Sequence, residues 1–405
     1  MTQVTLRAGF IPLVDAAPLI VAREIGVARA HDIDLQLSRS TSWAAVRDRL
    51  SVGDVDCAHM LSPIVIASQL GLGNAKAPMI APAGLSMNGN AISVSTELYQ
   101  EMHDVGWSAD MVRNPATSAV ALAKIIRKRA SAGEPALTFA SVYPFSTHSY
   151  ELRYWLASAG INPDTDVNLT IVPPPLMVDA LADGQIDGSC VGAPWSSISF
   201  EVGHSHIVAL KADLWRQGPE KVLAVREHWA DENPQTVSTL VQMLIHAAAW
   251  CSNPDNTDEL AQLLSDEKYL GIDAGIIGRT LRGLILGVGE APVENHLLFD
   301  PHRATYPWRS QALWFYAQMV RWRQIDHSEV NALAAKKAYR PDIYRKAFAT
   351  IPLLGSALFG PAENALGARS LEALEADTTL FDQRLFDPDD LPGYFSGLGL
   401  NVSVT

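Results

Sequence analysis

The chain has few of the residues and motifs that assign a protein to a class at once. Only three of its 405 residues are cysteines, Cys57, Cys190 and Cys251, and none stand at a CxxC spacing. This excludes a zinc or disulfide framework and is typical of a reducing compartment. No uncharged apolar run of about 18–20 residues occurs, so we expect no membrane insertion. The net charge of −13 argues against direct binding to nucleic acid.

Motifs of common catalytic and nucleotide-binding sites are also missing. The chain has no GxSxG, no GxGxxG and no GxxxxGK[ST] segment. Its eleven histidines form no HExxH pattern, and a solvated pair is the ordinary explanation for His204-Ser-His206, which could also chelate a metal. We therefore expect no metal, no cofactor and no enzymatic activity.

The first sixty residues alternate between strand and helix patterns. Strands are predicted at 4–10, 33–37 and 55–60, with helices at 16–30 and 43–51 between them. Such alternation with short connections is typical of βαβ units and a mainly parallel sheet. A ligand crevice is then expected at the carboxyl ends of the strands.

An internal repeat indicates two lobes. A short amphipathic helix, a glycine and an aspartate that leads into a buried strand occur at 46–60 and again at 177–191. A single junction of this kind is common in α/β proteins, where glycine ends the helix in a left-handed conformation. Two copies favour two similar lobes. The matching residues are Gly53 and Asp56 in the first copy and Gly184 and Asp187 in the second.

We predict three stretches of chain: a first lobe at 1–90, a second lobe at 91–200, and a return to the first lobe with C-terminal helical wrapping at 201–405. The segment 88–95 is predicted to cross between the lobes. The tail after Gly355 is rich in Pro and Gly and is interpreted as irregular. Helices are predicted at 149–158, 234–251, 257–264, 275–284 and 311–324.

Three segments carry side chains suited to a ligand, and each also has an ordinary explanation. Trp43, at a helix start, is either a core anchor or an apolar wall for a planar ligand. The segment 146–149 offers hydroxyls, an imidazole and free N–H groups at a helix N-terminus, an arrangement that binds anions, or else Thr147 caps the helix. Glu220-Lys221 is ordinarily an exposed salt-bridging pair.

A series of segments, in order along nearly the whole chain, resembles one family. In them the chain is similar to the nitrate and bicarbonate solute-binding proteins of ABC transporters (NrtA/CmpA type), and most similar to the cytoplasmic nitrate/nitrite sensors of the NasS type. The segments are 9–22, 41–48, 57–63, 88–89, 146–148, 151–156, 172–178, 190–195, 219–221 and 306–308.

The resemblance implies a fold and a site. The fold is α/β, two-lobed and periplasmic-binding-protein-like (type II), with a ligand cleft between the lobes and extra C-terminal helices. Trp43 matches the tryptophan beside the ligand, Thr147 and His148 match the Thr-His segment that binds it, and Lys221 matches the lysine that offsets its charge. Asn90 stands where the family usually has Gln, and it is one methylene shorter.

Nitrate is planar and singly charged, so an aromatic face with lysine, imidazole and amide donors suits it. Bicarbonate would need an acceptor for its proton, and the bicarbonate members resemble a calcium-assisted site. Lys221, where a carboxylate would help calcium, therefore favours nitrate or nitrite. A further departure is Ala193, where the transport proteins often have Glu before Pro-Trp.

By resemblance, the chain is expected to be a cytoplasmic nitrate/nitrite sensor that controls an RNA-binding antiterminator partner of the NasT type. The chain starts directly in its first strand pattern, without an export signal, which favours a cytoplasmic location. One alternative is the receptor of a nitrate or bicarbonate ABC transporter with its signal peptide removed. Another is an enzyme on the same scaffold.

Overall fold

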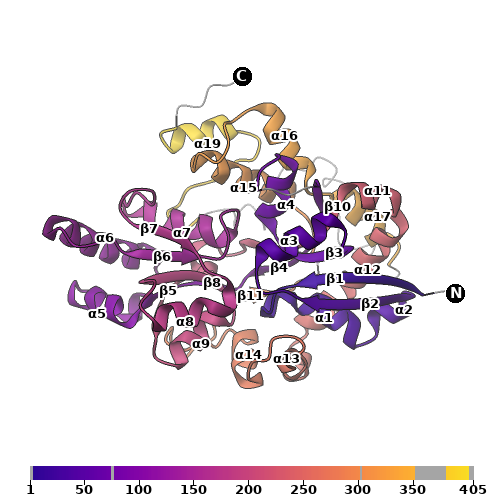
Figure 1. Cartoon of the computed structure of the whole chain (residues 1–405), viewed down its shortest axis with the longest axis horizontal. Helices are drawn as coiled ribbons and strands as arrows, with labels where there is room; N and C mark the ends of the chain where they lie inside the picture. Colours follow the sequence, from indigo (N-terminus) through magenta and orange to yellow (C-terminus); the bar gives the residue numbers. More distant parts are fainter. Residues whose placement is uncertain (1–2, 74–76, 302, 352–379, 401–405) are drawn as a thin grey trace.

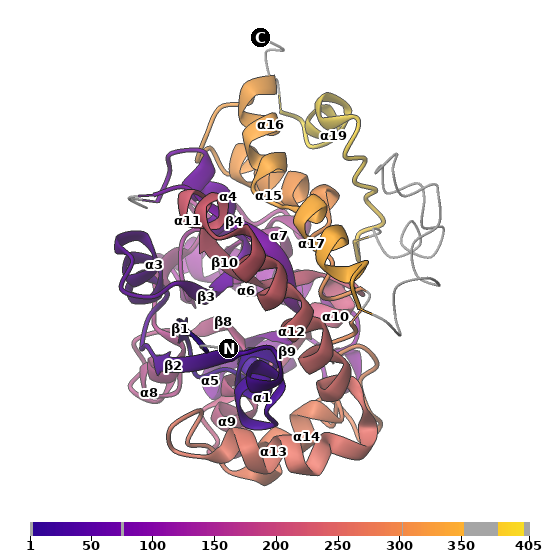
Figure 2. The same cartoon turned by 90° about the vertical axis from the view of Figure 1, so that its right-hand side faces the viewer.

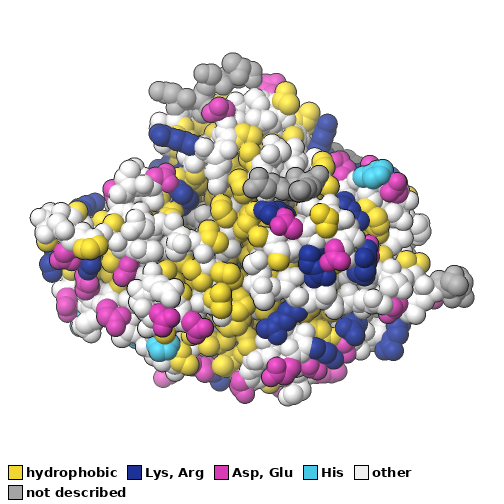
Figure 3. All heavy atoms as spheres, in the orientation of Figure 1, with side chains coloured by type: hydrophobic (Ala, Val, Ile, Leu, Met, Phe, Trp, Pro, Cys, Tyr) yellow, Lys and Arg dark blue, Asp and Glu magenta, His cyan; other side chains and the backbone are white. Residues whose placement is uncertain are grey.

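The computed structural model describes residues 3–73, 77–301, 303–351 and 380–400. They form two lobes side by side, each built on one β-sheet with helices packed on it (Figure 1). A group of C-terminal helices lies at one end of the molecule (Figure 2). On the face that Figure 3 shows, hydrophobic side chains gather along the line between the two lobes. Within the described ranges, no helix combines the length and apolarity needed to cross a bilayer.

The first lobe is built on a six-stranded sheet in the order β11-β4-β10-β3-β1-β2. β1 runs parallel to β2 and β3, which confirms the predicted βαβ start, whereas β10 runs antiparallel between β3 and β4. The strands are β1 (Val4–Phe10), β2 (Ile33–Arg39), β3 (Cys57–Leu61), β4 (Met79–Asn88), β10 (Pro219–Arg226) and β11 (Leu297–Leu298).

The second lobe is built on a five-stranded sheet in the order β7-β6-β8-β5-β9. The chain enters it at Gly89, with φ +90°, between β4 and β5, where the crossing segment was predicted. The predicted return at residue 201 comes too early, because β9 still pairs with β5, and the chain rejoins the first sheet only with β10. The strands are β5 (Asn90–Ser95), β6 (Thr138–Ser141), β7 (Asn168–Ile171), β8 (Gly188–Gly192) and β9 (Ser205–Leu210).

Helices cover both sheets. The helix predicted at 16–30 is in fact interrupted, because Gly26 adopts φ +83° between α1 and α2. In the first lobe and the segment after it lie α1 (Ala17–Glu24), α2 (Val27–Ala30), α3 (Trp43–Val52), α4 (Ser62–Gln69), α11 (Glu227–Glu232), α12 (Pro234–Ser252), α13 (Thr257–Ser265) and α14 (Ala274–Leu281). In the second lobe lie α5 (Thr96–Asp104), α6 (Pro115–Ala132), α7 (Thr147–Ser158), α8 (Met177–Ala182), α9 (Trp195–Glu201) and α10 (Lys211–Leu214).

The internal repeat is confirmed in the structure. Asp56 Oδ2 accepts a hydrogen bond from the Arg7 N–H of β1 at 2.9 Å. In the second lobe, Asp187 Oδ2 accepts one from the Thr138 N–H of β6 at 2.7 Å. The glycines that end the two preceding helices both have positive φ. Each copy therefore uses its aspartate to join the new strand to the parallel strand beside it, β1 in the first lobe and β6 in the second.

The C-terminal helices contact both lobes. α15 (Arg309–Arg321) packs on α4 of the first lobe, while the Tyr150 hydroxyl of α7 in the second lobe donates to Gln324 Oε1 at 2.7 Å. Much of the tail predicted to be irregular after Gly355 lies outside the described residues. Its described end includes a helix, α19 (Leu391–Gly397). The sequence did not predict α16 (Glu329–Lys337) and α17 (Pro341–Phe348).

Candidate functional site

Trp43 lies at the start of α3 and is fully buried. Its ring centroid is 5.2 Å from that of His59 on β3, and Lys221 Nζ of β10 is 5.4 Å from the centroid of the tryptophan ring. Its indole Nε1 has no hydrogen-bond partner among the described residues. The side chain thus belongs to the core, yet it keeps one donor available.

The N-terminus of α7 brings Thr147 and His148 to the interface between the lobes. Ser146, rather than Thr147, caps this helix, because its Oγ accepts from the Ser149 N–H at 3.0 Å. The Thr147 hydroxyl instead donates to Glu220 Oε1 at 2.5 Å. His148 Nδ1 lies 3.3 Å from Thr147 Oγ1, and its Nε2 is buried with no partner in the part of the chain that is described.

Asn90 begins β5 and is buried at the same interface. Its Nδ2 donates to Glu151 Oε2 at 2.9 Å and to Glu220 Oε2 at 2.8 Å. Both donor hydrogens are therefore used, and Oδ1 is the atom without a partner within the described ranges. This corrects the expectation that Asn90 offers a ligand its amide donor, because two carboxylates fix the orientation of the amide.

Lys221 is buried rather than exposed, so the ordinary explanation of Glu220-Lys221 is wrong. Its Nζ lies 2.8 Å from Asp15 Oδ2 and 2.5 Å from Glu220 Oε1. The ammonium charge is thus shared with two carboxylates and is not held in reserve for an anion alone.

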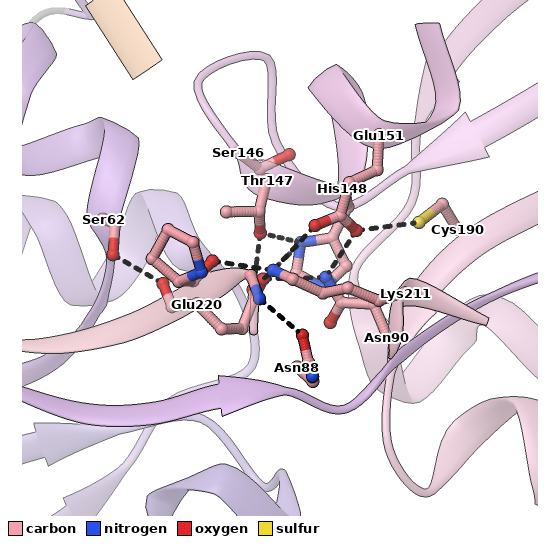
Figure 4. A network of polar contacts seen from close by, with 12 residues as sticks. Ser62, Asn88, Asn90, Ser146, Thr147, His148, Glu151, Cys190, Lys211 and Glu220 are labelled. Carbon is pink, nitrogen blue, oxygen red and sulfur yellow. Dashed lines mark hydrogen bonds and ion pairs between the residues drawn. The ribbon is translucent and has the colours of Figure 1, made fainter. Parts of the chain in front are cut away.

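These residues belong to a larger set of buried ionisable groups, which we call the charge cluster. Glu220 lies at its centre, with Thr147, His148 and Lys211 directed toward it (Figure 4). Lys211 also lies 2.7 Å from Glu151 Oε1. The charge cluster consists of Asp15, His59, His148, Glu151, Lys211, Glu220 and Lys221.

The electrostatics favour ionised carboxylates at Asp15 and Glu220 and neutral imidazoles. Burial opposes ionisation of Glu220, but Lys211 and Lys221 hold its pKa below the usual value. Burial also opposes ionisation of Asp15, yet Lys221 and His59 lower its pKa. Burial lowers the pKa of His148 to about 3. Among the described residues, no group of three or more His, Cys, Asp or Glu side chains is placed to hold a metal ion.

Gly192, at the end of β8, lets the unpartnered atoms approach one another. A Cβ added there would lie 3.5 Å from both Asn90 Oδ1 and His148 Nε2, and 3.4 Å from Leu13 of the first lobe. The neighbouring Ala193 carbonyl accepts from the Val14 N–H at 3.1 Å, which joins the second lobe to the first. The interface therefore closes around a place where buried polar atoms converge.

The structure brings together all five predicted site residues: Trp43, Asn90, Thr147, His148 and Lys221. Sequence reasoning missed the rest of the charge cluster, although most of it lay in the family-like segments. Lys211 lay in none of them and had no signal. His204-Ser-His206 is not part of the site, and the His206 ring stacks on Tyr99 with centroids 3.8 Å apart.

Comparison with known proteins agrees with this architecture. The model of the NMT1-like family matches residues 1–265. The chain belongs to the NMT1-like family. The chain is 32% identical to the nitrate/nitrite binding protein NrtA of Nostoc sp. over 402 aligned residues. The alignment covers 97% of this chain and 85% of that protein. The chain is 35% identical over 417 residues to the bicarbonate transport ATP-binding protein CmpC of Synechocystis sp., of which it spans 56%.

A solved structure shows the same fold for this NMT1-like chain. The periplasmic nitrate-binding protein NrtA from Synechocystis superimposes with a TM-score of 0.84 at 25% identity, covering 98% of each chain. The predicted two-lobed fold and the predicted membership of the NrtA/CmpA family are confirmed.

Proposed function

We propose that the chain is a solute-binding protein that holds a small planar oxyanion, nitrate or nitrite, between its two lobes. The observation that carries this proposal is the pair of unpartnered nitrogens, Trp43 Nε1 and His148 Nε2, buried at one interface. Buried polar atoms in proteins are nearly always hydrogen-bonded, so such atoms indicate a ligand. The similarity to proteins named as nitrate-binding supports the choice of anion.

The chemistry of the interface suits such an anion. A planar oxyanion can lie near the indole while its oxygens accept from surrounding N–H groups. Lys221, 5.4 Å from the centroid of the Trp43 ring, adds positive potential. Because the side chains are buried, the ligand must enter while the lobes are apart and be enclosed when they close.

The relatives support the receptor alternative of the sequence analysis more than the sensor. Those described above are named as a binding protein and as a transport component. We therefore propose a role beside a membrane transporter. The cytoplasmic location, the sensor role and the antiterminator partner of the NasT type stay predictions.

Bicarbonate is a second candidate, and one observation favours it. Asn90 turns an acceptor, Oδ1, toward the interface. Nitrate and nitrite carry no donor for this oxygen, whereas the hydroxyl of bicarbonate can donate to it. The similarity to CmpC, named for bicarbonate transport, is consistent with this candidate.

A thermal-shift and calorimetric titration tests the two candidates. Ligand-free protein is titrated with nitrate, nitrite, and bicarbonate with and without calcium. A ligand at 100 times its Kd should stabilise the fold by about 2.7 kcal/mol. Stabilisation by nitrate or nitrite supports the first proposal, and stabilisation by bicarbonate alone replaces it with the second. A folded protein that responds to none of the three contradicts both.

A further inference from the structure

The hydrogen bonds around His148 determine where its proton lies. The one hydrogen of the Thr147 hydroxyl is donated to Glu220 Oε1, 2.5 Å away, because an ionised carboxylate can only accept. Thr147 Oγ1 is then an acceptor toward His148 Nδ1 at 3.3 Å. A neutral His148 therefore carries its single proton on Nδ1, and its Nε2 presents a lone pair to the interface.

A lone pair at this place repels an anion. Nε2 and Asn90 Oδ1 both approach Gly192, each 3.5 Å from the position of an added Cβ, and both lack a donor among the described residues. Two acceptors directed at one place cannot hold nitrate or nitrite, whose oxygens are also acceptors. A second proton on His148 would convert Nε2 into a donor for the anion while Nδ1 keeps its hydrogen bond to Thr147.

The charges of the cluster lead to the same requirement. With neutral imidazoles and all three carboxylates ionised, Asp15, Glu151 and Glu220 face the ammonium groups of Lys211 and Lys221, which leaves one negative charge in excess. Burial raises the pKa of Glu151, while the donors on its two oxygens, Lys211 on Oε1 and Asn90 on Oε2, favour its ionised form. An added anion would raise the excess in a buried region, where unbalanced charge is costly.

We propose that nitrate or nitrite binds together with one proton, which His148 takes up on Nε2. This inference rests on the proposed function. The proton comes from solvent and adds to the free lone pair, so that an imidazolium donates to the anion and offsets its charge. His59 is a poor alternative acceptor, because its Nε2 faces Asp15 Oδ1 at 2.9 Å and its Nδ1 accepts from the Ile11 N–H at 3.5 Å.

The surroundings of His148 fit a group that stays neutral until the anion arrives. The pKa of His148 is lowered to about 3, chiefly by burial; the two lysines act in the same direction, and Glu220 and Asp15 oppose them. An anion in contact with Nε2 favours the protonated imidazole and therefore raises the pKa of His148. The ionisable groups around it are Glu151 on the same helix and, from other elements, Asp15, His59, Cys190, Lys211, Glu220 and Lys221.

Isothermal titration with sodium nitrate and sodium nitrite, in buffers of different ionisation enthalpy, counts the protons taken up. We expect about one proton per anion. Kd should then rise about tenfold per pH unit while the pH stays below the pKa that His148 acquires in the complex. Binding without proton uptake and without pH dependence overturns the inference and leaves the proposed function standing. Absence of binding overturns both.

Two variants and a spectroscopic readout test the assignment to His148. In His148→Gln, any remaining binding should lose its pH dependence, whereas the control His228→Gln, at a histidine 85% exposed, should keep it. In protein labelled with ¹⁵N-histidine, nitrate should convert one Nε2 signal from the unprotonated to the protonated form. That signal should be missing in His148→Gln. Proton uptake that persists in His148→Gln, or an unchanged Nε2 signal, contradicts the assignment.

Discussion

The two lobes share one structural junction but supply different groups to their interface. Asp56 in the first lobe and Asp187 in the second accept the same hydrogen bond from the parallel strand beside the one they precede. At the interface, the first lobe supplies two carboxylates and one ammonium, and the second supplies one of each. The repeat therefore determines the scaffold of each lobe, while the excess negative charge comes from the first lobe alone.

Glu220 connects the two halves. It lies on β10 of the first lobe, and it accepts from Asn90, Thr147 and Lys211, which all belong to the second. The closed interface depends on this one carboxylate, because separating the lobes would leave it with Lys221 as its main partner. The difference between the lobes can be tested by variants of each half.

Lys221→Ala should have the largest effect on stability. It removes the ammonium that compensates Asp15 and one oxygen of Glu220, and breaking a buried pair costs about 3–5 kcal/mol. Urea unfolding measures the loss. Arg49→Ala is the control, because its pair with Asp54 is partly exposed and should contribute less than about 1 kcal/mol. If Lys221→Ala and Arg49→Ala lost equal free energies of unfolding, the loss of a buried ammonium group would cost no more than the loss of a partly exposed guanidinium. The excess negative charge left in the first lobe would then carry no measurable cost.

Trp43→Ala should be nearly as destabilising, by about 3–5 kcal/mol, because it empties a fully buried site. Trp43→Phe keeps an aromatic ring and should cost less than about 1.5 kcal/mol. It should still weaken anion binding by about 0.5–1.5 kcal/mol, since the indole N–H is lost. Calorimetric titration measures the nitrate affinity of the Trp43 variants. A Trp43→Phe protein with unchanged nitrate affinity would show that the indole N–H does not contact the ligand.

The shared junction predicts equal effects in the two lobes. Asp56→Ala and Asp187→Ala should each cost about 1–3 kcal/mol, because each leaves a strand N–H without its acceptor. The Arg7 ion pair adds little, since its side chain is 47% exposed. Chemical denaturation of both variants tests this, with the Asn substitutions as milder controls that keep an acceptor. A large difference between the two losses of unfolding free energy would show that the two hydrogen bonds, although alike in geometry, do not stabilise their lobes equally.

Gly192→Ala should have the smallest effect on stability and a clear effect on binding. The added Cβ makes only ordinary contacts at 3.4–3.5 Å, so the free energy of unfolding should change by less than about 0.5 kcal/mol. It would occupy the place where Asn90 Oδ1 and His148 Nε2 converge, and nitrate affinity should fall more than about tenfold. Gly397→Ala, which meets nothing within 4 Å, is the control. Unchanged affinity would place the ligand elsewhere.

Much of the fold was predictable because it follows local rules. The period of apolar residues predicted β2, α3 and α12 to within a few residues, and Gly53 and Gly184 marked the ends of repeated helices. The break at Gly26 and the late return through β9 were missed. A glycine within an apolar pattern can lie inside a helix or end it, and a strand pattern does not state which sheet it joins.

The five site residues were predicted through family-like segments, and the structure brings all five to one interface. Their roles were less predictable. Lys221 was expected to offset the charge of an anion, but Asp15 and Glu220 already share the charge of its ammonium group. Asn90 was expected to donate, but two carboxylates turn its oxygen toward the interface. A residue type limits what an atom can do, and its neighbours decide which atom is available.

The strand and helix pattern and the repeat could be predicted from the chain because periodicity and glycine conformation are properties of short segments, and the resemblance to the family implied the short list of polar site residues. The buried pairs that surround Glu220 come from the packing of distant elements: Lys211 of α10 joins it to Glu151 of α7, and Lys221 joins it to Asp15, which precedes α1. These contacts join residues up to about 200 positions apart. Their charges interact strongly because folding removes them from water together, and no local pattern in the chain encodes that burial.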